Sequence, residues 1–336
     1  MNRRWVVSLA ACAGAILLLA AGLALAGYNA PEALGAMFRA ALGSPYAFFS
    51  QTLLRATPLI VLGLAVAFAF RGGALNIGAE GQFYAGAIAA TWTGLHVGGL
   101  PPILALPSVL VAGCGAGMAW GAIPAGLRAR FGVLEVITTL LLNFVAEALV
   151  SWMVTGPLQE ARRAYPESDP IAASAHLPLL TGRLHVGFLL ALLLAASLWW
   201  FFARTRLGFE FRAAGAGPLA AGTVGRIPVT RRLAQALLVS GAIAGLAGAV
   251  EVTGVSFVLF QNLSPGYGFT AIAVALLARL DPRAVIASGI FFGALEAGAA
   301  GMQRDAGVPS VVVYVVEAVV IVTLLLAGRR ATRVVS

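Results

Sequence analysis

The stretch that decides the fold runs from residue 63 to residue 82 and reads GLAVAFAFRGGALNIGAEGQ. An apolar run stops at Arg71, a glycine-rich turn with Asn76 and Glu80 follows, and a second apolar run begins at Phe83. Backbone that leaves helical form at membrane depth needs protein or water around it, because lipid cannot satisfy its polar groups. Breaks of this kind tend to lie where something passes through a membrane.

The composition is that of an integral membrane protein. Of 336 residues, 60% are hydrophobic and only 10% are charged, and the mean hydropathy is +0.93. A soluble domain has roughly 25% charged residues. Apolar segments and short connections use the whole length, so we expect a single membrane domain over residues 1–336. Cys12 and Cys114 both lie in apolar runs, which indicates small core residues rather than a disulfide or a metal site.

The basic residues exclude several functions. All 22 of them are arginine, and the net charge is +9. A Walker A loop needs a lysine to reach the phosphates, so the chain is not a standard P-loop ATPase. The arginines stand between apolar runs rather than on one basic face, which favours membrane orientation over nucleic-acid binding. His96, His176 and His185 form no ligand cluster, so we expect no metal, no cofactor and no catalytic residues.

The apolar runs predict an all-α polytopic membrane protein with about ten transmembrane helices, some short or broken. The first run follows Arg3 and Arg4 and is longer than a signal-peptide core, so we interpret it as a retained helix. Short, interrupted segments in both halves point weakly to a duplicated transporter core, although no sequence repeat supports it. The predicted spans are 5–27, 53–70, 82–97, 103–126, 133–154, 185–203, 233–254, 266–280, 284–301 and 310–327.

The arginines also predict the topology. With the N-terminus inside, 16 of the 22 arginines fall inside and 6 outside, so both termini are expected to be cytoplasmic. The loop at about 155–184 is then extracytoplasmic and the loop at about 204–232 cytoplasmic. Small residues around Pro218 in the inner loop predict a short helix that could serve as a docking element. The alternative is a positively charged loop that only sets the topology.

The fifth predicted span carries a polar stripe. Glu135, Thr139, Asn143, Glu147 and Ser151 are four residues apart, which places neighbours on one helix face. A charge at the centre of a span costs about 2.5–3.5 kcal/mol on insertion scales, so Glu147 should face other helices or water. The stripe is either the wall of a pathway or a set of hydrogen bonds between helices.

Other intramembrane groups have two interpretations each. Glu251, Glu296 and Glu317 lie in or near apolar spans and are either a proton relay or satisfied packing contacts. Asn76 can cap the third predicted helix, and Glu80 suits the positive end of a helix dipole, so a structural role is open for both. Ladders of small residues predict close helix packing, at 113, 117 and 121, at 241 and 245, and at 289, 293, 297 and 301.

Several motifs together resemble one known family. Residues 56–82 are similar to the signature of bacterial ABC-importer permeases of the ribose, nucleoside and branched-chain amino acid class, and NIGAEGQ at 76–82 is the most specific part. The resemblance covers most of the chain from about residue 50 and is closest to the nucleoside and simple-sugar branch. Ala278 departs from it, because a glycine is expected before Arg279. Further matches follow at 138–143, 208–227, 240–248 and 266–277.

The resemblance implies a transport subunit rather than an enzyme. Such a permease forms the pathway for a small polar solute, here a nucleoside or a simple sugar, in the bacterial plasma (inner) membrane. The implied partners are a separate ABC ATPase subunit, a second permease subunit of the same or a different chain, an extracytoplasmic solute-binding protein and membrane lipid. No nucleic acid is implied. The inner loop would carry the coupling helix that docks on the ATPase.

These considerations define two sets of candidate residues. The predicted pathway residues are Asn76, Glu80, Gln82, Asn143 and Glu147. The predicted coupling residues are Arg212, Gly215, Gly217, Pro218, Ala221 and Gly225. Two alternatives stay open: a proton-coupled secondary carrier that uses the buried glutamates, and a membrane scaffold that transports nothing.

Overall fold

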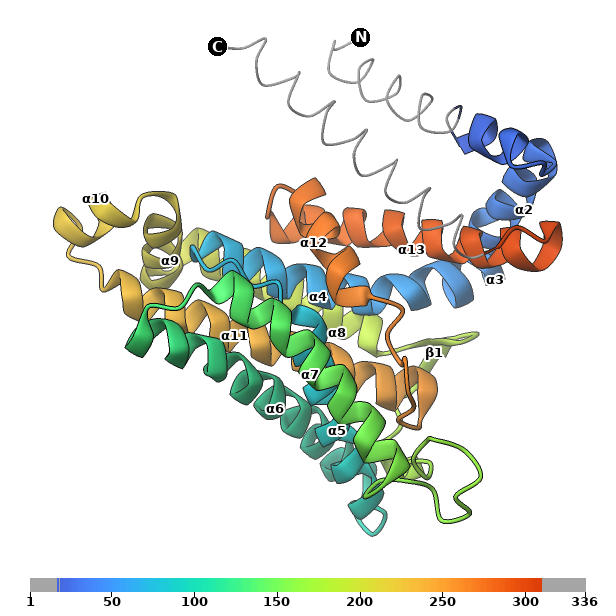
Figure 1. Cartoon of the computed structure of the whole chain (residues 1–336), viewed down its shortest axis with the longest axis horizontal. Helices are drawn as coiled ribbons and strands as arrows, with labels where there is room; N and C mark the ends of the chain where they lie inside the picture. Colours follow the sequence, from blue (N-terminus) through green and yellow to red (C-terminus); the bar gives the residue numbers. More distant parts are fainter. Residues whose placement is uncertain (1–16, 18, 310–336) are drawn as a thin grey trace. The chain divides into compact units, whose positions relative to one another are not determined.

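A computed structural model describes residue 17 and residues 19–309 (Figure 1). The chain divides into two compact units. Unit 1 comprises Met1–Ala56, Thr181–Leu184 and Ile290–Ser336, and unit 2 comprises Thr57–Leu180 and His185–Gly289. Most of the predicted first span and the whole of the last span lie outside the described residues, as do Cys12 and Glu317.

Unit 1 contains a helix that the apolar pattern did not predict. This is α2 (Ala30–Leu42), which begins after Asn29, whose side chain accepts a hydrogen bond from the Glu32 backbone N–H. The short α3 (Pro45–Ala47) and the π-helix η1 (Phe48–Leu53) follow. The last part of α13 (Pro282–Ala306) packs on α2, since an added Cβ at Gly301 would overlap Ala40. Buried residues of this unit include Leu23, Ala33 and Met302.

Unit 2 holds the greater part of the helical bundle. Its helices are α4 (Leu54–Arg71, from Thr57 on), α5 (Ala79–His96), α6 (Pro102–Phe131), α7 (Glu135–Thr155), α8 (Gly187–Arg204), α9 (Arg206–Ala216), α10 (Pro218–Thr223), α11 (Val229–Glu251), the π-helix η3 (Val252–Ser256), α12 (Tyr267–Leu277) and the first part of α13. The short elements η2 (Ala173–Ala175), β1 (Leu179–Thr181) and β2 (Leu184–His185) follow α7.

Six helices of the described chain are long and apolar enough to cross a membrane. The chain is therefore a mostly helical, multi-pass membrane protein, while the total of about ten spans and the side of each terminus stay predictions. The polar residues Glu80, Gln82 and His96 lower the hydropathy of α5, which is not among the six. The six candidate membrane spans are Pro45–Arg71, Pro102–Phe131, Glu135–Thr155, Gly187–Arg204, Val229–Ser256 and Pro282–Ala306.

The eighth predicted span is shorter than expected. The sequence predicts residues 266–280, whereas α12 ends at Leu277. Arg279 and Leu280 then take left-handed backbone conformations, with φ of 50° and 61°, and Pro282 starts α13. Ala278 keeps a right-handed φ of −72°, so alanine fits the position where the resemblance led us to expect glycine.

The core of unit 2 is built on close contact between helix backbones. Helices α5, α6 and α11 pack against one another, and α7 packs against α5 (Figure 1). An added Cβ at Gly117 of α6 would overlap the Gly241 carbonyl oxygen of α11, and one at Gly245 would overlap the Gly113 carbonyl oxygen. These contacts confirm that the small-residue ladders serve packing, as the sequence predicts.

Unit 2 has two ends that differ in their connections. We call the end that carries α9 and α10 the helical-loop end, and the end that carries residues 156–180 the long-loop end. The predicted short helix around Pro218 is confirmed by α10, and the preceding α9 was not predicted. At the opposite end the Ala172 N–H donates to the Gly94 carbonyl, which ties the long loop to α5.

Candidate functional site

The break between α4 and α5 turns back into the helical bundle. Gly73 has a left-handed φ of 83°, and residues 74–78 form no regular secondary structure. Asn76 Nδ2 donates to Ser240 Oγ at 2.9 Å, and that hydroxyl donates to the Ala65 carbonyl at 2.8 Å. Ala65 lies six residues before the end of α4, about 9 Å along the helix axis. Asn76 is therefore well inside the unit and not at its helical-loop end.

Two of the predicted pathway residues satisfy each other. Asn76 Nδ2 donates to Gln82 Oε1 at 2.8 Å, and Asn76 Oδ1 accepts from the Gly78 N–H at 2.9 Å. Both side chains are fully buried. A buried amide needs such partners, since an unpaired polar group costs about 1–3 kcal/mol. The pair fixes the shape of the break from within the protein.

Helix α7 holds the break from a second side. Asn143 Oδ1 accepts from the Gly81 N–H at 2.8 Å, and its Nδ2 donates to the Ile77 carbonyl at 2.9 Å. Thr139 Oγ1 accepts from the Ile77 N–H at 3.2 Å. Gly81 lies in the first turn of α5, where backbone N–H groups have no partner within the helix. Asn143 thus caps α5 from a neighbouring helix.

The predicted stripe of α7 divides into two parts. Glu135, Thr139 and Asn143 are buried and bond to the break or to Arg128, whereas Glu147 is exposed. A spacing of four residues drifts by about 40° at each step on a helix of 3.6 residues per turn. After three steps the stripe has turned away from the break.

Glu80 caps another helix. Its Oε2 accepts from the Gly268 N–H at 2.5 Å, in the first turn of α12, and the residue is buried. A carboxylate at this position offsets the unpaired N–H groups and the positive end of the helix dipole. The sequence predicts that Glu80 acts on the helix that contains it, and the structure places its carboxylate on α12.

A non-helical segment precedes α12. The 11 residues of α12 rise about 16 Å, about half of the ~30 Å hydrocarbon core of a bilayer. Residues 257–266 connect it to the long-loop end, where the Leu259 N–H donates to Ser168 Oγ at 2.9 Å. Tyr84 of α5 donates to the Ser264 carbonyl. The sequence leaves residues 255–265 between two predicted spans, in agreement with this segment, but assigns them no part in the candidate site, although Ser264, Pro265 and Gly266 are turn-forming residues.

A polar cavity lies where this segment faces α5 and α7. Its volume is about 360 Å³. Gln261 Nε2 donates to Ser151 Oγ at 2.8 Å, which links the segment to α7. Of the five predicted pathway residues, only Glu147 lines this cavity. The lining is formed by Tyr84, Phe144, Glu147, Ala148, Val150, Ser151, Gln261 and Asn262.

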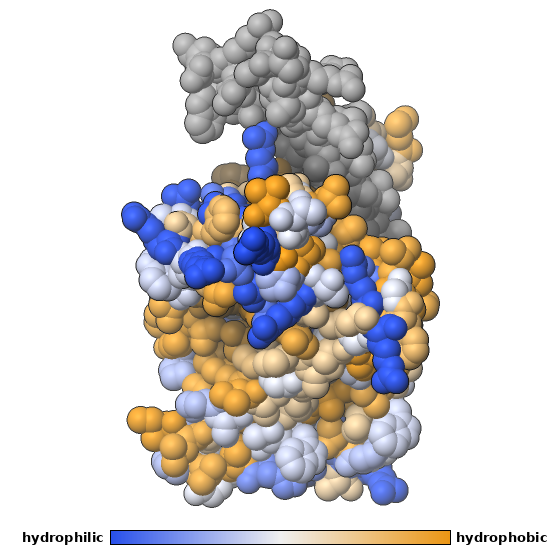
Figure 2. Space-filling model, turned by 90° about the vertical axis from the view of Figure 1, so that its left-hand side faces the viewer, coloured by the Kyte–Doolittle hydropathy of each residue, from blue (hydrophilic) through white to orange (hydrophobic). Residues whose placement is uncertain are grey.

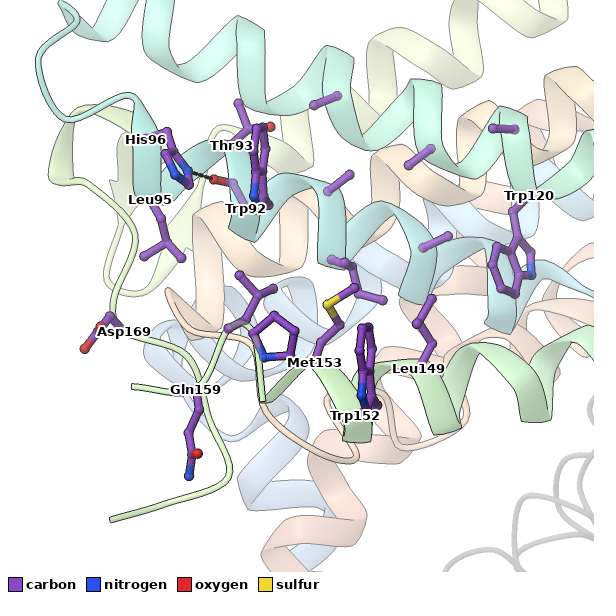
Figure 3. A pocket seen from close by; sticks show the side chains of 18 of the residues that line it. Trp92, Thr93, Leu95, His96, Trp120, Leu149, Trp152, Met153, Gln159 and Asp169 are labelled. Carbon is purple, nitrogen blue, oxygen red and sulfur yellow. Dashed lines mark hydrogen bonds between the residues drawn. The ribbon is translucent and has the colours of Figure 1, made fainter. Parts of the chain in front are cut away.

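A larger cavity, of about 1080 Å³, lies along α5, α6 and α7 (Figure 3). Trp92, Trp120 and Trp152 line it together with several alanines, and Gln159 and Asp169 lie toward the long-loop end. Walls of this kind offer few hydrogen-bond partners to a polar solute. The smaller cavity is therefore the better candidate for solute contact.

The predicted coupling residues occupy different environments at the helical-loop end. Gly215 of α9 packs against the break, since an added Cβ would overlap the Arg71 carbonyl oxygen. Ala221 is 6% exposed, whereas an added Cβ at Gly217 would meet only the Ala220 Cβ, at 3.9 Å. The other three, Arg212, Pro218 and Gly225, are exposed. Figure 2 looks onto this end and shows hydrophilic side chains among hydrophobic ones.

Helix α9 is fastened to the start of α11 by an ion pair. Arg232 donates to Glu210 Oε2 from Nε at 2.9 Å and from Nη2 at 2.6 Å. These hydrogen bonds hold the pKa of the Glu210 carboxyl below its usual range. These two hydrogen bonds fix the position of α9 and so define where α10, which follows α9, begins.

Two further glutamates were candidates for a proton relay. Glu251 is buried, and both Glu251 and Glu296 have interaction partners within the protein. No observation on the described residues favours the proton-coupled carrier.

Comparison with known proteins identifies the family. Residues 48–326 match the family described as branched-chain amino acid transport system / permease component, and the chain belongs to it. The chain is thus a permease component of an ABC transporter, a transport subunit rather than an enzyme.

Three relatives cover most of the chain. The glucose ABC transporter permease protein TsgB13 of Haloferax volcanii is 38% identical, over 92% of this chain and 84% of the relative. The guanosine ABC transporter permease protein NupP of Bacillus subtilis is 36% identical, over 98% and 93%. The nucleoside ABC transporter permease protein NupB of Lactococcus lactis is 34% identical, over 92% and 85%.

Proposed function

We propose that this permease imports a nucleoside or a simple sugar across the bacterial plasma membrane, with both termini in the cytoplasm. The observation that carries the proposal is the polar cavity beside the non-helical segment 257–266. Non-helical backbone is tolerated at membrane depth where it lines a water-filled route. Relatives named for guanosine, nucleosides and glucose support the same solute class.

The proposed pathway residues take different parts in this route. Glu147 faces the solute directly. Asn76, Glu80, Gln82 and Asn143 hold the break and the first turn of α12 in the shape that the route requires, which their buried hydrogen bonds support. These hydrogen bonds keep the buried polar backbone of the walls partnered, which a route through the bundle requires.

The proposed partners have separate surfaces. A second permease subunit, either a copy of this chain or a different one, covers part of α7, whose Trp152 is 57% exposed. An extracytoplasmic solute-binding protein docks at the long-loop end. The ABC ATPase docks on α10, and the coupling loop near 214–225 transmits its movement through Gly215 to the break. Membrane lipid covers the remaining apolar surface.

The first test is uptake by the purified permease in proteoliposomes, with and without its ATPase partner and ATP. We expect accumulation of labelled solute only when both ATPase and ATP are present, because this chain has no lysine and so no Walker A loop. A catalytically dead ATPase is the control. Uptake driven by a proton gradient alone would contradict the proposal and favour the carrier.

A second test concerns the dock. Leu219 of α10 is 81% exposed at a loop end that we place in the cytoplasm. We expect Leu219 to be a hot spot of this interface, where loss of one residue costs about 2 kcal/mol or more, so Leu219→Glu should weaken ATPase binding at least tenfold. Binding is measured by pull-down of the ATPase with the solubilised permease.

The matched control is Leu100→Glu, at a leucine that is 43% exposed at the long-loop end. It should leave ATPase binding unchanged. If both variants and the unaltered protein bind the ATPase equally well, the ATPase does not dock on α10.

A further inference from the structure

We propose that the 360 Å³ cavity is a recognition site for a ribonucleoside, and that Glu147, Gln261 and Asn262 determine its specificity. In this site Glu147 binds the ribose diol, the two amides bond the edge of the base, and Phe144 contacts the face of the base. The inference rests on the proposed function, since it names the solute class of the same route.

The volume and the lining favour a small neutral solute. Ligand sites have volumes of roughly 300–1,000 Å³, and this cavity lies at the lower end of that range. Glu147 is the one charged group in its lining, and no arginine or histidine of the described residues lines it. A phosphorylated nucleotide would therefore meet a carboxylate without a compensating cation, which disfavours it.

Glu147 needs a partner with hydrogen-bond donors. An ionised carboxylate only accepts, and its two oxygens can accept from two neighbouring hydroxyl groups. The vicinal hydroxyls of ribose supply two such donors, and carboxylates bind a ribose hydroxyl in nucleotide-binding folds. A deoxyribose ring lacks one of the two donors.

Gln261 and Asn262 suit the edge of a base. Asn262 offers two donors and an acceptor, and Gln261, whose Nε2 already donates once to Ser151 Oγ, offers one further donor and an acceptor. Such groups can pair with the donors and acceptors on the edge of a purine. Phe144 is 60% exposed and presents a ring to the same cavity. Stacking of a base on an aromatic ring is worth about 1–3 kcal/mol by alanine substitution. A hexose has no planar ring of this kind.

The segment that carries the amides is held in an unusual conformation. Asn262 has a left-handed φ of 58°, which non-glycine residues rarely adopt. Anchors on both sides maintain it: the Leu259 N–H donates to Ser168 Oγ, and the Tyr267 N–H donates to Ser264 Oγ, each at 2.9 Å. Strained backbone held by its surroundings is a feature of ligand-binding sites.

The experiment uses the complete transporter, with ATPase and binding protein, in proteoliposomes. ATP-driven uptake is measured for guanosine, for 2′,3′-dideoxyguanosine and for glucose. The variants are Glu147→Gln, Gln261→Ala and Asn262→Gly, of which the last keeps a residue that tolerates the left-handed conformation. Glu32→Gln, at an exposed carboxylate of α2, is the control, and the yield of folded protein is measured for each variant.

We expect guanosine to be transported well, the dideoxy compound at least tenfold less efficiently, and glucose poorly. Glu147→Gln should lower kcat/KM for guanosine about tenfold to a hundredfold, in line with loss of hydrogen bonds to a charged group, and should leave the dideoxy compound unaffected. Gln261→Ala and Asn262→Gly should lower the uptake of both nucleosides.

Two results would overturn the inference and leave the proposed function intact: ATP-driven uptake of glucose with no uptake of guanosine, or equal losses for both nucleosides in Glu147→Gln. Absence of ATP-driven uptake for every nucleoside and sugar offered would instead contradict the proposed function, and the inference with it.

Discussion

Gly117→Ala in α6 should strongly destabilise the protein, and Gly115→Ala two residues away should not. A Cβ at Gly117 would overlap the Gly241 carbonyl oxygen and lie 2.7 Å from the Gly245 Cα, whereas one at Gly115 would meet nothing within 4 Å. Backbone atoms cannot rotate aside as a side chain can, so α6 and α11 must separate. Overpacking of a well-packed core costs about 1–3 kcal/mol.

The two variants have the same chemistry and the same intrinsic propensity. Alanine is better than glycine in a helix interior by about 0.8–1 kcal/mol, so Gly115→Ala should be neutral or slightly stabilising. Thermal unfolding of the detergent-solubilised proteins, followed by intrinsic fluorescence, measures the difference. Equal midpoints would mean that α6 and α11 do not meet at Gly117.

The long apolar helices could be predicted from the sequence because their length follows from the thickness of the membrane. The third predicted span illustrates the limit. It starts at residue 82, whereas α5 starts at Ala79, because the first turn contains Glu80 and Gly81 and is capped by Asn143 from α7. Hydropathy carries no information about a cap from another helix.

Amphipathic helices were missed for a different reason. Helix α9 contains Arg206, Glu210 and Arg212 and was predicted as loop. Its N-terminus is capped by Thr205, whose hydroxyl accepts from the Gly208 N–H at 2.9 Å. Its C-terminal end is held by the contact between Gly215 and the break. The capping residue Thr205 can be found in the sequence, whereas the contact of Gly215 with the break cannot.

The polar residues of the candidate site can be selected from the sequence, but their part in transport stays a prediction, because it depends on partners that one sequence does not show. Their positions in the sequence predicted that Asn76, Glu80 and Asn143 belong to the solute pathway. Which of them faces a solute is decided by how far the stripe on α7 turns and by where residues 257–266 run. Gln261 and Asn262 lie in that segment and were overlooked, because a search for long apolar runs takes no account of the residues that connect those runs.

The capping arrangement explains why two helix ends can lie inside the bundle. The first turns of α5 and α12 both begin within unit 2, away from its helical-loop end, where unpaired N–H groups would otherwise be costly. Asn143 supplies an acceptor to α5, and Glu80 supplies one to α12. Since Glu80 belongs to α5, the two caps form a chain from α7 through α5 to α12.

Asn143→Leu should therefore lower the free energy of unfolding, whatever its effect on transport. Leucine has the same number and branching of side-chain heavy atoms as asparagine but leaves the Gly81 N–H and the Ile77 carbonyl without their partners. Each buried group left unpaired costs about 1–3 kcal/mol, so we expect a loss of about 2–6 kcal/mol. Thermal unfolding in detergent and uptake per folded molecule are measured on the same preparations.

Thr138→Leu is the control on the same helix, since the Thr138 hydroxyl bonds to the carbonyls of Leu134 and Glu135, at the start of the helix that contains it. It should change stability little. Two interpretations of Asn143 then separate. If Asn143→Leu is destabilised and its folded fraction transports normally, the residue is an anchor for the break. If stability is retained and uptake is lost, Asn143 contacts the solute and the hydrogen bonds to Gly81 and Ile77 are replaced during transport.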